Sequence, residues 1–216
     1  ILPKIKKIII KSFDKLKKIF FLFRYGIFKY RSIEGFLSAL EAITLCRLAK
    51  KMSINAVIVE IGSWKGKSTF CLAKGLENGK VYAIDPFDAS GDDESAVVYK
   101  KKMGTVSLFE QFKKQMVRLS VMDKIEPLVG FSRDFLDKFE KIDLLFIDGD
   151  HSIGGCDFDY MNFSPKIRKG GYLVFHDFGE GREEVGPNWV IKNRINSLNE
   201  YEFIGIYDSL WVAKKK

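Results

Sequence analysis

The sequence predicts an α/β fold: a seven-stranded, mostly parallel sheet with an antiparallel last strand, preceded by N-terminal helices. Short apolar runs rich in β-branched residues alternate with helical segments, which is typical of repeated β-α-β units and a parallel sheet. Near the C-terminus, two apolar runs are separated by a very short turn, so that pair of strands must be antiparallel. The chain of 216 residues is long enough for one such domain with a substantial core.

The N-terminal arm, residues 1–31, is predicted to form an amphipathic helix. Its apolar residues recur every three or four positions, and lysines occupy the opposite face. The apolar residues are Leu2, Ile5, Ile9, Phe13, Leu16, Phe20, Phe23 and Ile27, and the lysines are Lys4, Lys7, Lys11, Lys15 and Lys18. Three partners stay open for this arm: its own domain or a sister subunit in a homo-oligomer, an anionic membrane surface in a peripheral contact, or a polyanion such as RNA.

The net charge of +8 comes from this arm. Residues 1–31 hold ten Lys or Arg and one acid, Asp14, whereas residues 32–216 have a net charge of −1. The high isoelectric point therefore describes the arm and not the domain, and nucleic acid is not the expected partner. The chain has no uncharged apolar run of about 20 residues, so we expect no membrane-spanning helix.

The rest of the chain, residues 32–216, is expected to form one domain. Its first helix is predicted to run from Ser32 or Ile33 to about Lys51, with Ser32 as the N-cap. Strands are predicted at residues 56–61, 81–84, 125–129, 143–147, 172–175, 201–207 and 210–213. Further helices are predicted at residues 68–74, 95–118, 157–167 and 188–198, with Gly170 and Gly171 separating the third of these from the next strand.

The three cysteines, Cys46, Cys71 and Cys156, are too few and too scattered for a disulfide framework or a zinc cluster. Each lies in an apolar segment, so we expect buried free thiols. This expectation favours a reducing, cytoplasmic location.

The segment from Val59 to Ser68 has the composition of a nucleotide-binding loop. Glycines let the backbone approach a ligand, and a helix N-terminus offers N–H groups to an anion. NAD fits poorly, because Trp64 stands where the dinucleotide fingerprint has its middle glycine. A P-loop needs four residues between its glycines, whereas Gly62 and Gly66 enclose three. A P-loop-like ATPase is kept as an alternative function.

Two acids favour S-adenosylmethionine (SAM) as the ligand of this loop. Glu60 lies two residues before Gly62, a position that neither other motif uses for an acid. Asp85 ends the second predicted strand, 23 residues after Gly62, where a carboxylate can accept hydrogen bonds from both ribose hydroxyls.

The stretch Glu60–Ser68 resembles motif I of the small-molecule O-methyltransferases related to catechol O-methyltransferase. Asp143–Ser152 and Gly170–Asp177 resemble a narrower branch, which includes the macrocin-type sugar O-methyltransferases and the methyltransferase-like cephalosporin hydroxylase proteins. The Glu34–Ser38 opening, before the helix that contains Glu41, is similar to that branch too. Residues 33–213 thus resemble a class I SAM-dependent methyltransferase with a Rossmann-like fold.

This resemblance implies a SAM site and a reaction. It places Glu60, Gly62, Ser63, Trp64, Gly66, Ser68, Asp85, Phe131, Ser132 and Asp148 at the cofactor. Within that set, Ser68 would help to hold the methionine carboxylate, Phe131 and Ser132 would lie beside the adenine, and Asp148 would bind the SAM amine. The implied reaction is O-methylation of a small hydroxylated acceptor, including a sugar of a glycoconjugate or natural product. A SAM-binding module without catalysis is a second alternative.

The chain has only two histidines, His151 and His176, and each follows a central strand at the carboxyl edge, where such sheets bind ligands. We assign His151 as the general base, beside Asp148, because an imidazole titrates near neutral pH. Asp148 and Asp177 could bind Mg²⁺ with His176 as a third ligand, although an imidazole favours a softer divalent metal or none. The glycine-rich loop 178–187 is predicted to be a substrate lid or a mobile surface loop.

Overall fold

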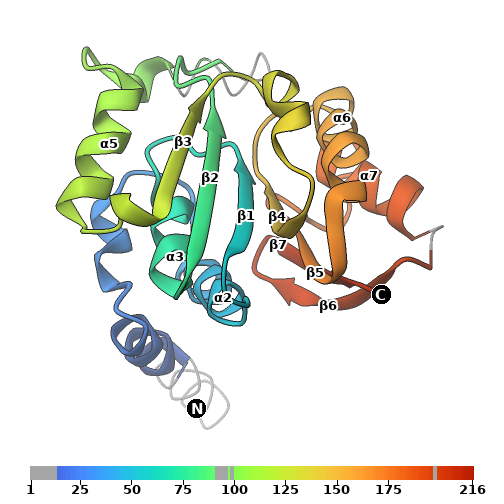
Figure 1. Ribbon diagram of the computed structural model, residues 1–216, viewed down its shortest axis with the longest axis horizontal. Helices are drawn as coiled ribbons and strands as arrows, with labels where there is room; N and C mark the ends of the chain where they lie inside the picture. Colours follow the sequence, from blue (N-terminus) through green and yellow to red (C-terminus); the bar gives the residue numbers. More distant parts are fainter. Residues whose placement is uncertain (1–13, 91–96, 98–99, 197–198) are drawn as a thin grey trace, which may run out of the picture.

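The computed structural model describes residues 14–90, 97, 100–196 and 199–216 (Figure 1). It contains one seven-stranded sheet in the order β3-β2-β1-β4-β5-β7-β6. The strands are β1 (Ala56–Ile61), β2 (Gly79–Asp85), β3 (Ile125–Val129), β4 (Ile142–Ile147), β5 (Ile167–Phe175), β6 (Tyr201–Tyr207) and β7 (Leu210–Lys215). Neighbours from β3 to β5 are parallel, and β7 is antiparallel to both β5 and β6. The predicted fold class is confirmed.

Helices cover both faces of this sheet. The helices are α2 (Ala39–Lys50), α3 (Lys67–Gly75), α5 (Leu108–Arg118), α6 (Ile153–Phe163) and α7 (Gly186–Val190), which continues into a π-helical turn at Ile191–Ile195. Figure 1 shows α2, α3 and α5 on one side of the sheet and α6 and α7 on the other. Alternate residues of the central strands enter two separate core clusters, so that β4 is buried along its whole length.

The second helix begins later than predicted. Its N-cap is Ser38 and not Ser32, which ends a 3-10 turn at Phe28–Ser32. The Ser38 hydroxyl accepts from the Glu41 amide, and the Glu41 carboxylate accepts from the Ser38 amide. This reciprocal capping box satisfies two backbone donors at once, which an isolated Ser32 cap would not do.

Three further elements have boundaries that differ from those predicted. The helix expected at 157–167 covers Ile153–Phe163, and Gly170 and Gly171 lie inside β5 because Ile167 already pairs with Ile142 of β4. The helix expected at 95–118 is α5, which starts only at Leu108, after a break at Gly104. Part of that expected range lies outside the described residues. All three cysteines are buried free thiols, as predicted.

The N-terminal arm is helical over residues 14–24, and the predicted apolar positions before residue 14 lie outside the described residues. Leu22, Ile27 and Tyr30 belong to the core cluster formed with α2 and α3. The boundary expected at residue 31 therefore falls inside a packed segment. No helix in the described ranges is long and apolar enough to cross a membrane.

Candidate active site

The loop between β1 and α3 turns sharply through left-handed backbone. Gly62 and Gly66 have φ values of 89° and 86°, and Trp64 has a φ of 48°. A Cβ on Gly62 would lie 2.1 Å from the carbonyl oxygen of Asp148, so only glycine lets the loop pass this close to the end of β4. A left-handed tryptophan is costly, and such backbone strain concentrates at functional sites.

Asp85, at the end of β2, organises this loop. Its Oδ2 accepts from the amides of Ser63, at 2.9 Å, and Trp64, at 2.7 Å. Its Oδ1 accepts from the amide of Phe87 at 2.6 Å. Burial raises the pKa of Asp85, and these three hydrogen bonds oppose the rise. Both carboxylate oxygens are thus engaged with backbone amides, and the ribose contact stays a prediction.

Glu60 lies beneath the loop with 0% of its surface exposed. Its Oε2 accepts from the hydroxyls of Ser63, at 3.0 Å, and Thr69. Burial nevertheless raises the pKa of Glu60 to about 7. Neither Glu60 nor Gly66 lines the cavity described next. These two predicted cofactor residues shape the loop from below, and a direct contact with the cofactor stays a prediction.

A cavity of about 1300 Å³ follows the carboxyl edge of the sheet. It brings most of the predicted site residues together: Gly62, Ser63, Trp64, Ser68, Asp85, Phe131, Ser132, Asp148, His151, His176 and Asp177. At the end beside β3, Phe131 is 44% exposed and the Ser132 hydroxyl donates to Asp159 at 2.5 Å. Burial raises the pKa of Asp159 to about 7.

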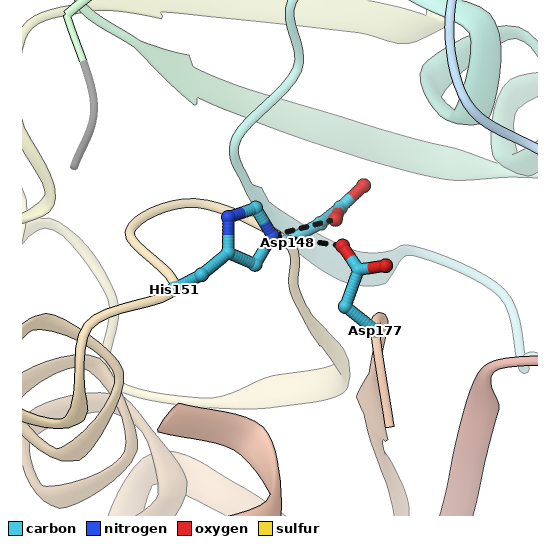
Figure 2. Close-up of side chains that lie close together, drawn as sticks. All are labelled: Asp148, His151 and Asp177. Atoms are coloured by element: carbon cyan, nitrogen blue, oxygen red, sulfur yellow. Dashed lines mark ion pairs between the residues drawn. The ribbon is translucent and has the colours of Figure 1, made fainter. Parts of the chain in front are cut away.

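At the other end of the cavity, Asp148, His151 and Asp177 point toward one another (Figure 2). Asp148 follows β4, Asp177 follows β5, and His151 lies on the loop before α6. His151 Nε2 lies 2.9 Å from Asp177 Oδ2 and 3.8 Å from Asp148 Oδ1. One ligand atom from each residue lies within 4.8 Å of the other two, which suits a single cation. Asp177 has a φ of 56°, a further sign of strain at this site.

The two carboxylates change the charge of His151. Burial disfavours its protonation, but Asp148 and Asp177 outweigh burial and raise the pKa of His151 to about 10. A histidine with this pKa is protonated at neutral pH and cannot accept a proton. The general-base role assigned to His151 stays a prediction. It requires that Asp148 and Asp177 no longer raise the pKa of the imidazole.

His176 lies beside this group, and its role as a metal ligand stays a prediction. Its side chain is 5% exposed and lies behind the two aspartates. Its Nδ1 is 3.0 Å from Asp148 Oδ1 and 3.2 Å from Asp177 Oδ2. Its Nε2 is 3.5 Å from Glu41 Oε2. Burial opposes protonation of His176, but these three carboxylates hold its pKa far above the usual range. The structure thus places both histidines against Asp148 and Asp177, and adds His151 to the candidate metal ligands.

Glu41 is the site residue that the sequence analysis missed. It is 3% exposed on α2, and its Oε1 accepts from the amide and the hydroxyl of Ser209, at 2.9 and 2.7 Å. Burial works against its ionisation, but hydrogen bonds from His176, Ser209 and Ser38 lower the pKa of Glu41 to about 2. The Ser38–Glu41 spacing could have indicated a helix cap, but nothing in the sequence indicates the contact with His176.

The loop 178–187 also borders the cavity, through Arg182, Glu184 and Val185. It is tied at both ends. The Asn188 amide group bonds to the backbone of Gly179, and the Gly186 amide donates to the carbonyl of His151 at 2.8 Å. Closure of this loop over a substrate stays a prediction.

Comparison with known proteins places this site within a recognised domain. The family model of a methyltransferase domain matches residues 59–178, which include the loop, Asp85 and the Asp148–His151–Asp177 group. An uncharacterized protein of Acanthamoeba polyphaga mimivirus is 30% identical over 125 residues. That match covers 57% of this chain and 52% of the viral protein, so the chain spans about half the length of this curated relative.

Two solved structures share the fold. The O-methyltransferase TomG from Streptomyces achromogenes, in complex with SAM, is 17% identical, with a TM-score of 0.62 and coverage of 84% of this chain and 82% of TomG. An O-methyltransferase from Bacillus cereus, in complex with SAH, is 18% identical, with a TM-score of 0.59 and coverage of 92% and 90%. At these identities the similarity establishes the fold alone.

Proposed function

This chain belongs to the methyltransferase domain family, and we propose that it is a SAM-dependent O-methyltransferase with a small hydroxylated acceptor, of which a sugar is the first class to test. The observation that carries this proposal is one continuous cavity. Its first end is formed by the loop from Gly62 to Gly66, and its other end is formed by Asp148, His151 and Asp177. A methyl donor and an acceptor oxygen must be aligned in one space for direct transfer.

The first end of the cavity fits SAM. It lies at the carboxyl edge of the parallel strands, where open α/β sheets bind nucleotides. Ser68 lies in the first turn of α3, whose N-terminal amides suit the methionine carboxylate. Phe131 offers an exposed ring to the adenine. When bound, SAM supplies an electrophilic methyl carbon. The SAM and SAH complexes of TomG and the Bacillus cereus enzyme support this choice of cofactor.

The second end fits a divalent cation. Asp148 and Asp177 would each give a carboxylate oxygen and His151 a ring nitrogen, a mixed set that suits Mn²⁺ or Zn²⁺ as well as Mg²⁺. Such a cation would lower the pKa of a bound acceptor hydroxyl. His176 contacts both aspartates, and Glu41 contacts the other ring nitrogen of His176, so His176 would orient the two carboxylates.

A binding experiment tests the cofactor. The thermal stability of the full chain is measured with SAM, SAH, ATP and NAD, each with and without Mg²⁺. A ligand at about 100 times its Kd adds about 2.7 kcal/mol. We expect SAM and SAH alone to stabilise the chain. Stabilisation by ATP with Mg²⁺ alone would instead support the P-loop-like ATPase and would overturn the proposal.

A transfer experiment tests the reaction. The chain is incubated with methyl-labelled SAM and a panel of hydroxylated compounds that includes sugars, with Mg²⁺, with Mn²⁺ or with a chelator. We expect label in at least one acceptor, formation of SAH, and loss of both with the chelator. SAM binding without transfer to any acceptor would favour a non-catalytic SAM-binding module.

A further inference from the structure

The arm helix, residues 14–24, has two apolar faces, and only one of them is used by the domain. Leu22 is fully buried in the core cluster, and Phe21 and Tyr25 pack against that cluster. The other face carries Leu16, Phe20 and Phe23, which are 62%, 58% and 61% exposed. The sequence pattern had predicted these three residues and Ile27 on the apolar side of the helix, and of the four Ile27 is the one that packs into the core.

The exposed face is a continuous patch. Positions 16, 20 and 23 lie on one side of a helix with about 3.6 residues per turn. After the turn at Gly26, the ring of Phe28 stacks on that of Phe23 with centroids 4.4 Å apart. Phe28 is itself 37% exposed. We call these four side chains, Leu16, Phe20, Phe23 and Phe28, the arm patch. An exposed patch of this kind marks a contact surface.

Positive charge surrounds the arm patch. By the helical period, Lys17 and Arg24 follow it on one side and Lys15 on the other, and all three are exposed. Arg31 lies over the Phe28 ring at 5.0 Å. Between residues 14 and 31 there are six basic residues and one acid, Asp14. Figure 1 shows the helix standing out from the body of the domain, so that the patch can meet a broad surface.

We propose that the arm patch docks this protein on an anionic lipid surface. Aromatic and leucine side chains would enter the boundary between headgroups and acyl chains, while the flanking Lys and Arg would lie among the anionic headgroups. A protein partner or RNA is less suited, because a protein interface would bury the basic flanks and RNA, whose bases can stack on the phenylalanine rings, offers no apolar contact to Leu16. This inference is independent of the proposed methyl transfer.

The test uses the full chain and sedimentation with vesicles of phosphatidylcholine, with and without phosphatidylserine. We expect binding only to the vesicles that contain phosphatidylserine, and weaker binding at high salt. Phe20→Glu should reduce binding more than about tenfold, because it places a charge in the buried face of the interface. Val117→Glu is the matched control. Val117 is 63% exposed on α5, and its replacement adds the same charge outside the arm patch, so vesicle binding should change little.

Melting temperature and SAH binding report whether either variant has lost its fold, and both should match the wild type. Lack of vesicle binding by the wild type, or an equal loss in both variants, would overturn the proposal. Analytical ultracentrifugation provides a second check. A dimer that dissociates on Phe20→Glu would show that the arm patch instead binds a second copy of this chain. Tight RNA binding that survives Phe20→Glu, without vesicle binding, would likewise overturn it.

Discussion

The carboxylates at the two ends of the cavity have different kinds of partner. At one end, which we call the loop side, Glu60 and Asp85 accept hydrogen bonds from hydroxyls and amides of their own loop. At the other, the histidine side, Glu41, Asp148 and Asp177 share the two imidazoles of His151 and His176. The loop side holds two carboxylates by hydrogen bonds from neutral hydroxyls and amides, whereas the histidine side brings three potential metal ligands, Asp148, His151 and Asp177, within 4.8 Å of one another. The arrangement of ligands at the histidine side suits a bound cation, whereas the hydrogen bonds of the loop side maintain the shape of the cofactor pocket.

The largest expected effect tests the histidine side. Asp177→Asn removes an anionic ligand but keeps the shape of the side chain, so methyl transfer should fall more than about 100-fold, beyond what supporting residues of metal sites cost. SAH affinity should stay within a few-fold, because the loop side is unchanged. The measurement is initial rate with the acceptor found in the screen.

Asp137→Asn is the control for that variant. Asp137 is exposed and is not among the residues that line the cavity. Its rate should remain close to the wild type. Equal losses in the two variants would mean that Asp177 has no special role.

The next effect tests the loop side. Gly62→Ala places a Cβ 2.1 Å from the Asp148 carbonyl oxygen, in a left-handed conformation. We expect loss of SAH binding and a decrease in the free energy of unfolding on the order of 3 kcal/mol. Gly104→Ala is the control, because Gly104 also has a positive φ, of 72°, but no atom lies within 4 Å of the added Cβ. Its cost should be about 1 kcal/mol. A similar cost for both would show that the close approach at Gly62 is unimportant.

The third prediction concerns the pH dependence of stability. The pKa of Glu60 is raised from 4.5 to about 7 in the folded chain. The stability from its protonated form is therefore fully present below pH 4.5 and is lost as pH rises through about 7. Glu60→Gln removes this dependence. The free energy of unfolding, measured with denaturant, should therefore fall less between these two pH values in the variant than in the wild type, by roughly 2 kcal/mol. Parallel curves for the two proteins would contradict the assigned pKa.

The smallest effect concerns Glu41, which touches the histidine side only through His176. Glu41→Gln can still accept from Ser209 but loses the charge that faces the imidazole. We expect divalent-cation affinity to fall about tenfold, as for supporting residues of other metal sites, with SAH affinity unchanged. Glu77→Gln, at an exposed ion pair with Lys50, should alter neither. An unchanged cation affinity in Glu41→Gln would limit Glu41 to a structural role.

Strand positions were predicted more accurately from the sequence than helix starts. Strands β1 and β3 were predicted to the residue. For β1 the reason is that central parallel strands are short apolar runs with clear ends. Helix starts were less certain. Ser32 and Ser38 are both plausible caps, and only the reciprocal bonds with Glu41 distinguish them. The start of α6 was missed because Gly154 and Gly155 are weak helix formers.

The sequence predicted which strand ends form the site, but not which side chains contact one another there. Asp148, His151 and Asp177 all follow central strands, so their convergence on one edge could be inferred from the sequence. Which histidine is the more deeply buried could not, because that depends on α2 placing Glu41 against His176. Likewise, the burial of Glu60 beneath its loop depends on the hydroxyls of Ser63 and Thr69, which the motif alone does not specify.

The most direct test of this contrast is a titration of the full chain with Mn²⁺, followed by electron paramagnetic resonance of the free ion. We expect one Mn²⁺ site per chain that is lost in Asp148→Asn and retained in Glu60→Gln, because among the described residues it is at the histidine side that three ligand atoms lie within 4.8 Å of one another. Absence of Mn²⁺ binding, or equal binding by the wild type and Asp148→Asn, would contradict the assignment of the histidine side as a cation site.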